Sequence, residues 1–252
     1  MRPVTKLSPG VYHYQDGSII QIDTDYPDYS DAKITLIFNL GSICSYCEKS
    51  FNDERELAVE HLQAKKYKDV NGDYPYATLA TKWNNFLLSC ATCNGPDNKG
   101  NKNLVYGECH LPHLNNTFLS FQYKAGGVVE VNSALRGKSL DNAKALHLLV
   151  GLNKGPKDAR PKDKRWLIRT QKWDLAMRYL GKLEDGSADV ETIIDLVKGH
   201  GCWSIWFTIF KEHPEVRKEL IEQFSGTAKE CFDSANNYEP VPRNPQNNID
   251  PV

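Results

Sequence analysis

The sequence predicts an α+β protein, because strand-like and helix-like patterns occupy different parts of its 252 residues. In the first half, short stretches have the alternation of apolar and polar residues that half-buried strands show. Beyond residue 140 the apolar residues recur every three or four positions, which is typical of amphipathic helices. Two pairs of cysteines stand among the predicted strands. We therefore expect a cysteine-stapled core of short strands, followed by a mostly α-helical accessory region.

The N-terminal extension, residues 1–29, is predicted to form a hairpin. Residues 11–14 and 19–22 have strand character, and Asp16 and Gly17 between them favour a tight turn.

The next segment carries the cysteines. Ser30 is a suitable N-cap and Gly41 a suitable stop for a helix over residues 30–40. The elements expected after this helix are a strand over 56–62, a polar surface loop over 63–82, a strand over 83–89 and a helix that begins at Cys93.

The second half of the chain is predicted to contain one hairpin, over residues 117–131, and then helices only. The helical stretches are 140–150, 161–183, 190–197, 202–210 and 214–224. The chain thus divides into an N-terminal extension (1–29), a core (30–105), a helical accessory or partner-docking region (106–233) and an extended Asn- and Pro-rich tail (234–252).

Composition restricts where the protein works and what it binds. No apolar run approaches the roughly 20 residues of a membrane span, and the N-terminus has no apolar signal segment. We therefore expect a cytoplasmic protein that does not contact a membrane. The net charge is −1, so binding to nucleic acid would need a local basic face or a partner that supplies one.

The cysteine spacing predicts a zinc site. Two Cys-x-x-Cys pairs, each able to aim two sulfurs at one point, are typical of four thiolates around one Zn²⁺: Cys44, Cys47, Cys90 and Cys93. Three further cysteines, Cys109, Cys202 and Cys231, are an odd remainder, which favours reduced thiols over a disulfide scaffold.

A second pattern lies between and beside the two cysteine pairs. The chain reads Cys44-Ser-Tyr-Cys47-Glu, Val59-Glu-His61, Trp83-Asn-Asn85-Phe-Leu-Leu-Ser-Cys90 and Cys93-Asn94. This resembles the HNH endonucleases, which have the ββα-metal (His-Me finger) core. Over most of residues 1–104 the chain is also similar to the PtuB family, the nuclease subunits of Septu-type and retron-linked antiphage systems.

The resemblance implies a role for each matching residue. His61 is the expected general base, and Asn85 is expected to orient it. Glu60 and Asn94 are expected to hold a catalytic Mg²⁺ or Mn²⁺, beside the structural Zn²⁺. Lys65, Lys66 and Lys99 are candidate contacts to the phosphates of DNA or RNA. The family also implies a partner, an ABC/SMC-type ATPase of the PtuA type.

Two further stretches of the sequence bear on the binding of nucleic acid and of ATP. The stretch 154–172 is rich in basic residues and predicts either a solvated helix face or a grip on nucleic acid or a partner, through Lys162, Arg165 and Arg169. The stretch 136–139 resembles the end of a P-loop, but Asn132 stands where the first glycine is needed. The ATPase is therefore expected in another chain.

Several of these residues also have a purely structural interpretation. Glu60 can be an ordinary exposed acid, and Asn94 a cap of the second cysteine turn. The alternative for the whole chain is a zinc-stapled adaptor that binds nucleic acid or protein without cutting. That alternative predicts that the side chains of Glu60, His61 and Asn94 do not converge.

Overall fold

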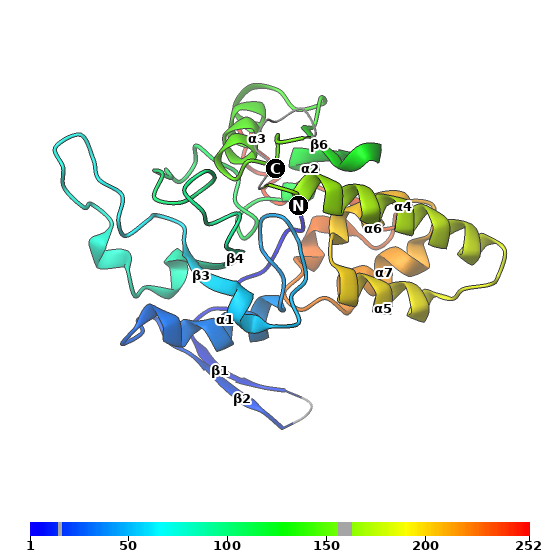
Figure 1. Ribbon diagram of the computed structural model, residues 1–252, viewed down its shortest axis with the longest axis horizontal. Helices are drawn as coiled ribbons and strands as arrows, with labels where there is room; N and C mark the ends of the chain where they lie inside the picture. Colours follow the sequence, from blue (N-terminus) through cyan, green and yellow to red (C-terminus); the bar gives the residue numbers. More distant parts are fainter. Residues whose placement is uncertain (15–16, 156–162) are drawn as a thin grey trace.

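Two antiparallel strands, β3 (Leu57–His61) and β4 (Phe86–Cys90), run through the cysteine-bearing half of the computed structural model (Figure 1). The model describes residues 1–14, 17–155 and 163–252. Leu57 pairs with Cys90 and His61 pairs with Phe86. Both predicted strands are therefore confirmed. The second begins three residues later than expected, because Trp83–Asn85 form a 3₁₀ turn.

Helix α1 (Ala32–Leu40) packs against both of these strands through its buried residues, among them Leu36 and Leu40. It ends at Gly41, where φ is 80°, as predicted. The predicted N-cap Ser30 is wrong. Asp28 begins a 3₁₀ turn over Tyr29–Asp31 and accepts a hydrogen bond from the Ser30 amide at 2.8 Å.

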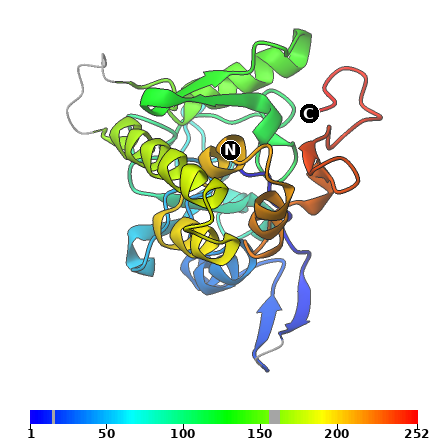
Figure 2. The same ribbon diagram turned by 90° about the vertical axis from the view of Figure 1, so that its right-hand side faces the viewer.

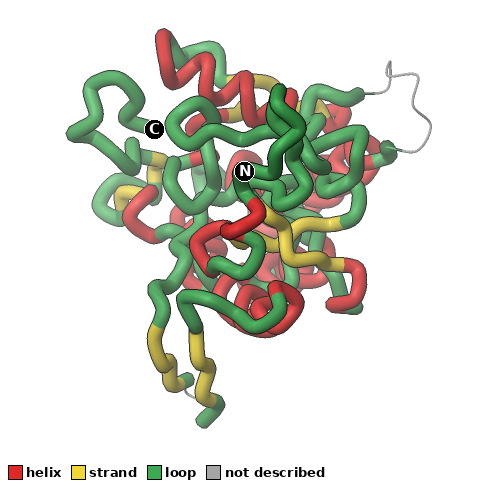
Figure 3. The backbone as a smooth tube through the Cα atoms, turned by 90° about the vertical axis from the view of Figure 1, so that its left-hand side faces the viewer, coloured by secondary structure: helices red, strands yellow, loops and turns green. Residues whose placement is uncertain are grey.

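The predicted N-terminal hairpin is confirmed as β1 (Gly10–His13) and β2 (Ile19–Ile22), which project from the body of the molecule (Figures 1 and 3). Of the two predicted turn residues, Asp16 lies outside the described residues.

The helix expected from Cys93 is not formed. Residues 91–116 are all described, and they run through turns and irregular backbone. Pro96 disfavours the helical conformation at Gly95 before it, and Gly100 has a φ of 43°. Instead, the Lys99 amide donates to the Cys93 carbonyl at 3.0 Å and the Asn98 side chain donates to the Thr92 carbonyl at 2.6 Å. The strand pair of the expected core is therefore present, but its helix is replaced by turns.

The C-terminal half is mainly helical, as predicted. A short helix α2 (Thr117–Ser120) leads into the hairpin of β5 (Phe121–Lys124) and β6 (Val128–Val131). The helices that follow are α3 (Gly137–Leu149), α4 (Arg165–Glu184), α5 (Val190–His200), α6 (Trp203–Ile209) and α7 (Pro214–Glu222). Helices α4 to α7 gather on one side of the molecule (Figures 1 and 2).

One contiguous hydrophobic core joins the two halves. It extends from Leu36 on α1 through Phe86 on β4 to Trp203 on α6, all fully buried. At Gly127 in the β5–β6 turn, an added Cβ would meet the Trp166 carbonyl of α4 at 2.0 Å, so only glycine permits this contact. The described part of the chain contains no helix that is both long and apolar enough to cross a membrane.

The C-terminal stretch, which the sequence predicts to be an extended tail, packs onto the body of the protein. It contains the two-residue strand β8 (Glu239–Pro240), which pairs with β7 (Phe232–Asp233) just before the stretch. Asp250 is buried and accepts hydrogen bonds from His110 (3.0 Å), Ser139 (2.7 Å) and Asn142 (2.6 Å). These bonds compensate the burial of the carboxylate and hold the stretch in place.

We expect Asp250→Asn to lower the free energy of unfolding by about 1–3 kcal/mol, because an amide NH₂ would then face hydrogen-bond donors. Urea denaturation measures this. The matched control is Asp195→Asn, since the Asp195 side chain is 70% exposed and its carboxylate lies 3.9 Å from Lys198. Equal stability of the two variants would contradict the role of Asp250.

Candidate functional site

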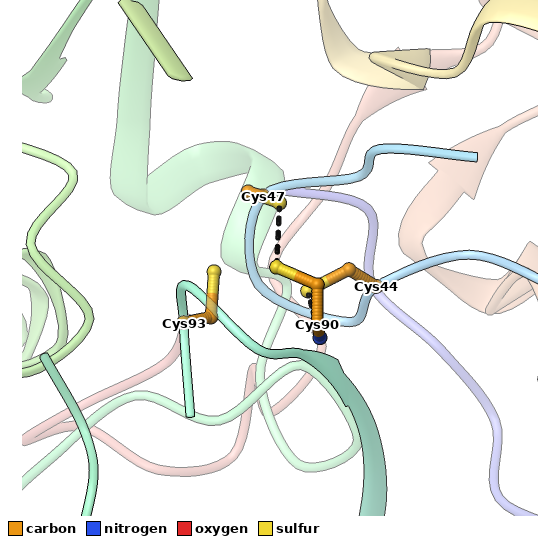
Figure 4. A group of neighbouring side chains, drawn as sticks. All are labelled: Cys44, Cys47, Cys90 and Cys93. Carbon is orange, nitrogen blue, oxygen red and sulfur yellow. Dashed lines mark hydrogen bonds between the residues drawn. The ribbon is translucent and has the colours of Figure 1, made fainter. Parts of the chain in front are cut away.

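The four predicted zinc ligands meet at one point. Their sulfur atoms all lie within 4.8 Å of one another and all four side chains are buried (Figure 4). Cys44 and Cys47 lie on the turn between α1 and β3, Cys90 ends β4, and Cys93 follows three residues later. The pairing of β3 with β4 and the packing of α1 thus bring two distant segments of the chain to the same place.

Local hydrogen bonds shape each cysteine turn. In the first, the Glu48 amide donates to the Cys44 carbonyl and the Cys44 amide donates to the Lys49 carbonyl, both at 3.0 Å. The two turns are joined by the Cys90 amide, which donates to the Cys44 sulfur at 3.4 Å. The sulfurs are therefore placed by backbone that is itself hydrogen-bonded.

The geometry and the electrostatics of the quartet suit a zinc ion. Zn–S bonds of about 2.3 Å in a tetrahedron place the sulfurs about 3.8 Å apart, and the sulfurs of Cys47 and Cys90 are 3.8 Å apart. Thiolates this close together repel one another, so four of them can share the site only with a cation between them. The quartet can hold one structural zinc.

Arg165 attaches helix α4 to the cysteine quartet. Its Nη1 donates to the Cys93 sulfur at 3.2 Å and to the Val150 carbonyl at 2.8 Å. The other face of the guanidinium pairs with Asp163, at 2.9 and 2.6 Å. A zinc bound to four thiolates carries a net negative charge, which this buried cation offsets.

Two of the three residues predicted to grip nucleic acid or a partner from stretch 154–172 do not lie on the surface. Arg165 and Arg169 are both buried, and Arg169 donates to the Gly127 carbonyl at 2.7 Å. Both guanidinium groups therefore point into the protein, because carbonyl and sulfur acceptors inside it satisfy them. Lys162 lies outside the described residues.

His61 ends strand β3 in a defined orientation. Its Nε2 lies 2.9 Å from the Ala80 carbonyl, which can only accept, so Nε2 carries the proton. The ring packs edge-on against Tyr29 and Phe86, with centroids 5.0 and 5.2 Å away. Burial lowers the pKa of His61, which outweighs the opposing effect of the Ala80 hydrogen bond. At neutral pH the ring is therefore neutral, and Nδ1 is the basic nitrogen.

Asn85 acts on the backbone around His61 and not on its ring. Its Oδ1 accepts from the Gln63 amide at 2.8 Å, and its Nδ2 donates to the carbonyls of Gln63 (3.0 Å) and Leu79 (3.1 Å). These bonds hold both ends of the loop that starts after His61. Because Leu79 adjoins Ala80, Asn85 also places the carbonyl that orients the His61 ring.

Glu60 faces the opposite side of the strand from His61, since successive side chains of a strand alternate. It is almost completely buried, and its carboxylate lies 3.3 Å from the Lys99 ammonium. Burial raises the pKa of Glu60 to about 7, although Lys99 acts in the opposite direction. Lys99 also donates to the His61 carbonyl at 3.1 Å. It is fully buried, so its ammonium contacts protein groups and no phosphate on the surface.

Glu60 and Asn94, the predicted ligands of Mg²⁺ or Mn²⁺, have other contacts in this conformation. Asn94 is half-buried, and its backbone N–H donates to the Cys90 carbonyl at 3.0 Å, a bond of the second cysteine turn that does not depend on the Asn94 side chain. The Glu60 carboxylate is paired with the Lys99 ammonium and is closed to solvent. A catalytic divalent cation, by contrast, needs room for water and substrate oxygens in its coordination shell. Among the described residues, the cysteine quartet is the one group of three or more His, Cys, Asp or Glu residues placed to hold a metal.

Of the predicted phosphate contacts in the 63–82 loop, Lys66 is exposed and Lys65 is half-buried. The Lys65 ammonium lies 3.3 Å from the centroid of the Tyr29 ring, which in turn touches His61. Tyr29 and Ala80 were not among the predicted site residues. Ala80 acts through its carbonyl, which any residue has, so no side-chain pattern could identify it.

Comparison with known proteins supports one part of the predicted resemblance. No family model matches the chain. It is 35% identical over 81 residues to the Septu protein PtuB of Bacillus mycoides (strain KBAB4). The match covers 29% of this chain and 28% of that protein, so it spans less than a third of either. The chain is thus similar to a Septu protein over a limited region.

We expect the purified chain to contain one zinc per molecule, and Cys90→Ser to lose it, because a hydroxyl is a poor fourth ligand for this ion. Elemental analysis measures the zinc content. Cys231→Ser is the control, since Cys231 is buried outside the quartet. Zinc retained at full stoichiometry in Cys90→Ser would exclude the quartet as the site.

Arg165→Met should speed the release of zinc to a chelator by about 10-fold or more, because it removes the hydrogen bond and the positive charge beside Cys93. Arg169→Met is matched to it, since Arg169 is a second buried arginine of α4 and bonds to Gly127 instead. The same release rate in both variants would show that the contact with Cys93 has no effect on the metal.

Proposed function

We propose that this chain is the nuclease component of a Septu-type antiphage system, an HNH endonuclease that hydrolyses phosphodiester bonds of DNA or RNA. The similarity to a Septu protein supports the defence role. The β3–β4 hairpin, with the cysteine quartet at one end and His61 at the other, supports the enzyme class. The partner in this proposal is an ABC/SMC-type ATPase of the PtuA type, encoded separately.

The observation that carries the catalytic proposal is the state of His61. Its Nε2 is committed to the Ala80 carbonyl and its ring is neutral, so Nδ1 can take a proton from an attacking water. Asn85 maintains this orientation through Gln63 and Leu79. Glu60 and Asn94 do not fit a hydrated divalent cation in this conformation. The role proposed for His61 therefore involves no such cation, and a chelator control tests whether cleavage depends on one.

A second candidate function has a specific observation in its favour. Glu60 and His61 point to opposite faces of β3, and Glu60 is paired with Lys99. The non-catalytic alternative, a zinc-stapled adaptor for nucleic acid or protein, predicts this lack of convergence. Cleavage itself decides between the two.

The decisive variant is His61→Gln. Its amide can still donate to the Ala80 carbonyl, but it has no basic nitrogen. We expect cleavage of plasmid DNA or of RNA, in the presence of the ATPase partner and Mg²⁺ or Mn²⁺, to fall at least about 100-fold. Zinc content and stability should not change. His200→Gln is the control, because His200 is exposed at the end of α5. Normal cleavage by His61→Gln would refute the role of His61.

The pH dependence gives an independent check. A general base acts when unprotonated, and burial lowers the pKa of His61 below its ordinary value of 6.5. The cleavage rate should therefore rise with pH below 6.5 and be level above it. EDTA, followed by added Mg²⁺ or Mn²⁺, tests whether a second metal is needed. Absence of any cleavage with the partner present, under both metals, would favour the adaptor.

A further inference from the structure

A cavity of about 710 Å³ lies next to the candidate site. Its walls come from three distant segments: the N-terminal residues 6–9, the 3₁₀ turn at Trp83–Asn85, and the chain between residues 106 and 114. Gln63 and Asn85, which hydrogen-bond to each other beside His61, form part of its lining. The volume is in the range of small-molecule sites in proteins.

One end of the cavity carries a positive charge that no acid neutralises. Lys6 donates to the Trp83 carbonyl, and its ammonium lies 4.6 Å from the centroid of the Trp83 ring. Among the described residues no carboxylate lies within 4 Å of this ammonium. Burial without such a partner lowers the pKa of Lys6 to about 7. An anion in the cavity would supply the missing charge.

His113 lines the same cavity, and its ring holds an unsatisfied polar atom that is turned away from the open space. Its Nδ1 is buried and has no hydrogen-bond partner within the described structure. Burial, together with the charges of Lys6 and Arg243, lowers the pKa of His113 to about 3, so the ring is neutral. A buried polar atom without a partner costs about 1–3 kcal/mol, and a ligand would recover this free energy by a turn of the His113 ring that brings the nitrogen to the cavity.

The remaining lining is apolar and flat. Leu7, Pro9 and Leu79 form walls, and Tyr106 and Leu114 are 41% and 44% exposed. Asn84 contributes an exposed amide that can donate and accept hydrogen bonds. A metal cation would be repelled by Lys6, and a purely apolar ligand would leave Lys6 and His113 unpaired. The lining instead suits a planar ring with polar edges that carries an anionic group.

We propose that this cavity binds one nucleotide, with its phosphate at Lys6 and His113 and its base between Leu79 and Tyr106. The same chemistry can come from a free mononucleotide or from one unit of a nucleic-acid strand. The second source deepens the proposed function, because it would hold a substrate strand beside Gln63 and Asn85. Binding as such does not require that His61 catalyse hydrolysis.

The test measures binding to the zinc-loaded full chain in EDTA-free buffer without Mg²⁺ or Mn²⁺, by calorimetry and by Trp fluorescence. The probes are nucleoside monophosphates, the corresponding nucleosides, inorganic phosphate and a short single-stranded oligonucleotide. We expect Lys6→Met to weaken nucleotide binding at least about 10-fold. The control is Lys144→Met, which removes an exposed lysine of α3 that does not line the cavity.

A second variant guards against misfolding of Lys6→Met. Leu114→Trp places a large ring at the mouth of the cavity, at a position that is already 44% exposed, and should block binding without loss of stability. Binding of mononucleotides identifies the free ligand as the source, and binding of the oligonucleotide alone identifies a strand. No binding of either at about 1 mM, or equal binding by wild type, Lys6→Met and Leu114→Trp, would overturn the proposal.

Failure of this proposal can be separated from failure of the proposed function. Cleavage lost in His61→Gln with nucleotide binding intact would support both. Nucleotide binding without cleavage by the wild type would support the cavity alone. If the wild type binds no nucleotide and cleavage is unchanged in Lys6→Met and Leu114→Trp, the proposed nuclease function stands and the proposed nucleotide site is rejected.

Discussion

The fold of this protein depends on the meeting of four sulfurs from two distant segments. The first cysteine turn follows α1 and the second follows β4, so their contact closes the chain around the whole of strand β3 and the long loop after it. A cation is the natural centre of such a quartet, because burial disfavours four thiolates without one. Arg165 extends the same electrostatic arrangement to helix α4, since its guanidinium reaches the sulfur of Cys93. The strand pair and the helical half are thereby connected at the cysteine quartet, which is the predicted zinc site.

This closure explains how the His61 ring is held in one orientation. The loop that leaves β3 returns at Ala80, whose carbonyl fixes the proton on Nε2. Asn85, at the start of β4, bridges the two ends of that loop through Gln63 and Leu79. A neutral amide is suited to this task, because it both donates and accepts and does not titrate. The candidate base is therefore oriented by backbone groups. The side chain that arranges them, Asn85, also lines the cavity beside Trp83.

Several charged residues serve the interior of the protein. Lys99 pairs with Glu60 inside the strand region, Arg165 and Arg169 bond to sulfur and carbonyl acceptors, and Asp250 is surrounded by donors. Each group is buried with a partner, as the cost of desolvation requires. A count of basic residues along the sequence therefore overstates the charge available to a nucleic acid on the surface. Lys6 differs from these residues, because it is half-buried beside a cavity and contacts a carbonyl and a ring in the described structure.

The sequence by itself determined the features that depend on local pattern or on a specific spacing. These were the α+β class, the strand pair at 57–61 and 86–90, the helices of the second half and the four cysteines as one cluster. Only the tertiary structure decided which side chains share a pocket. Strand alternation separated Glu60 from His61, and turns stand in place of the helix expected from Cys93. The compensation of buried charge drew Lys99, Arg165 and the C-terminal stretch inward. Pairings of this kind join residues that are far apart in the chain, so the periodicity of apolar residues in the sequence does not predict them.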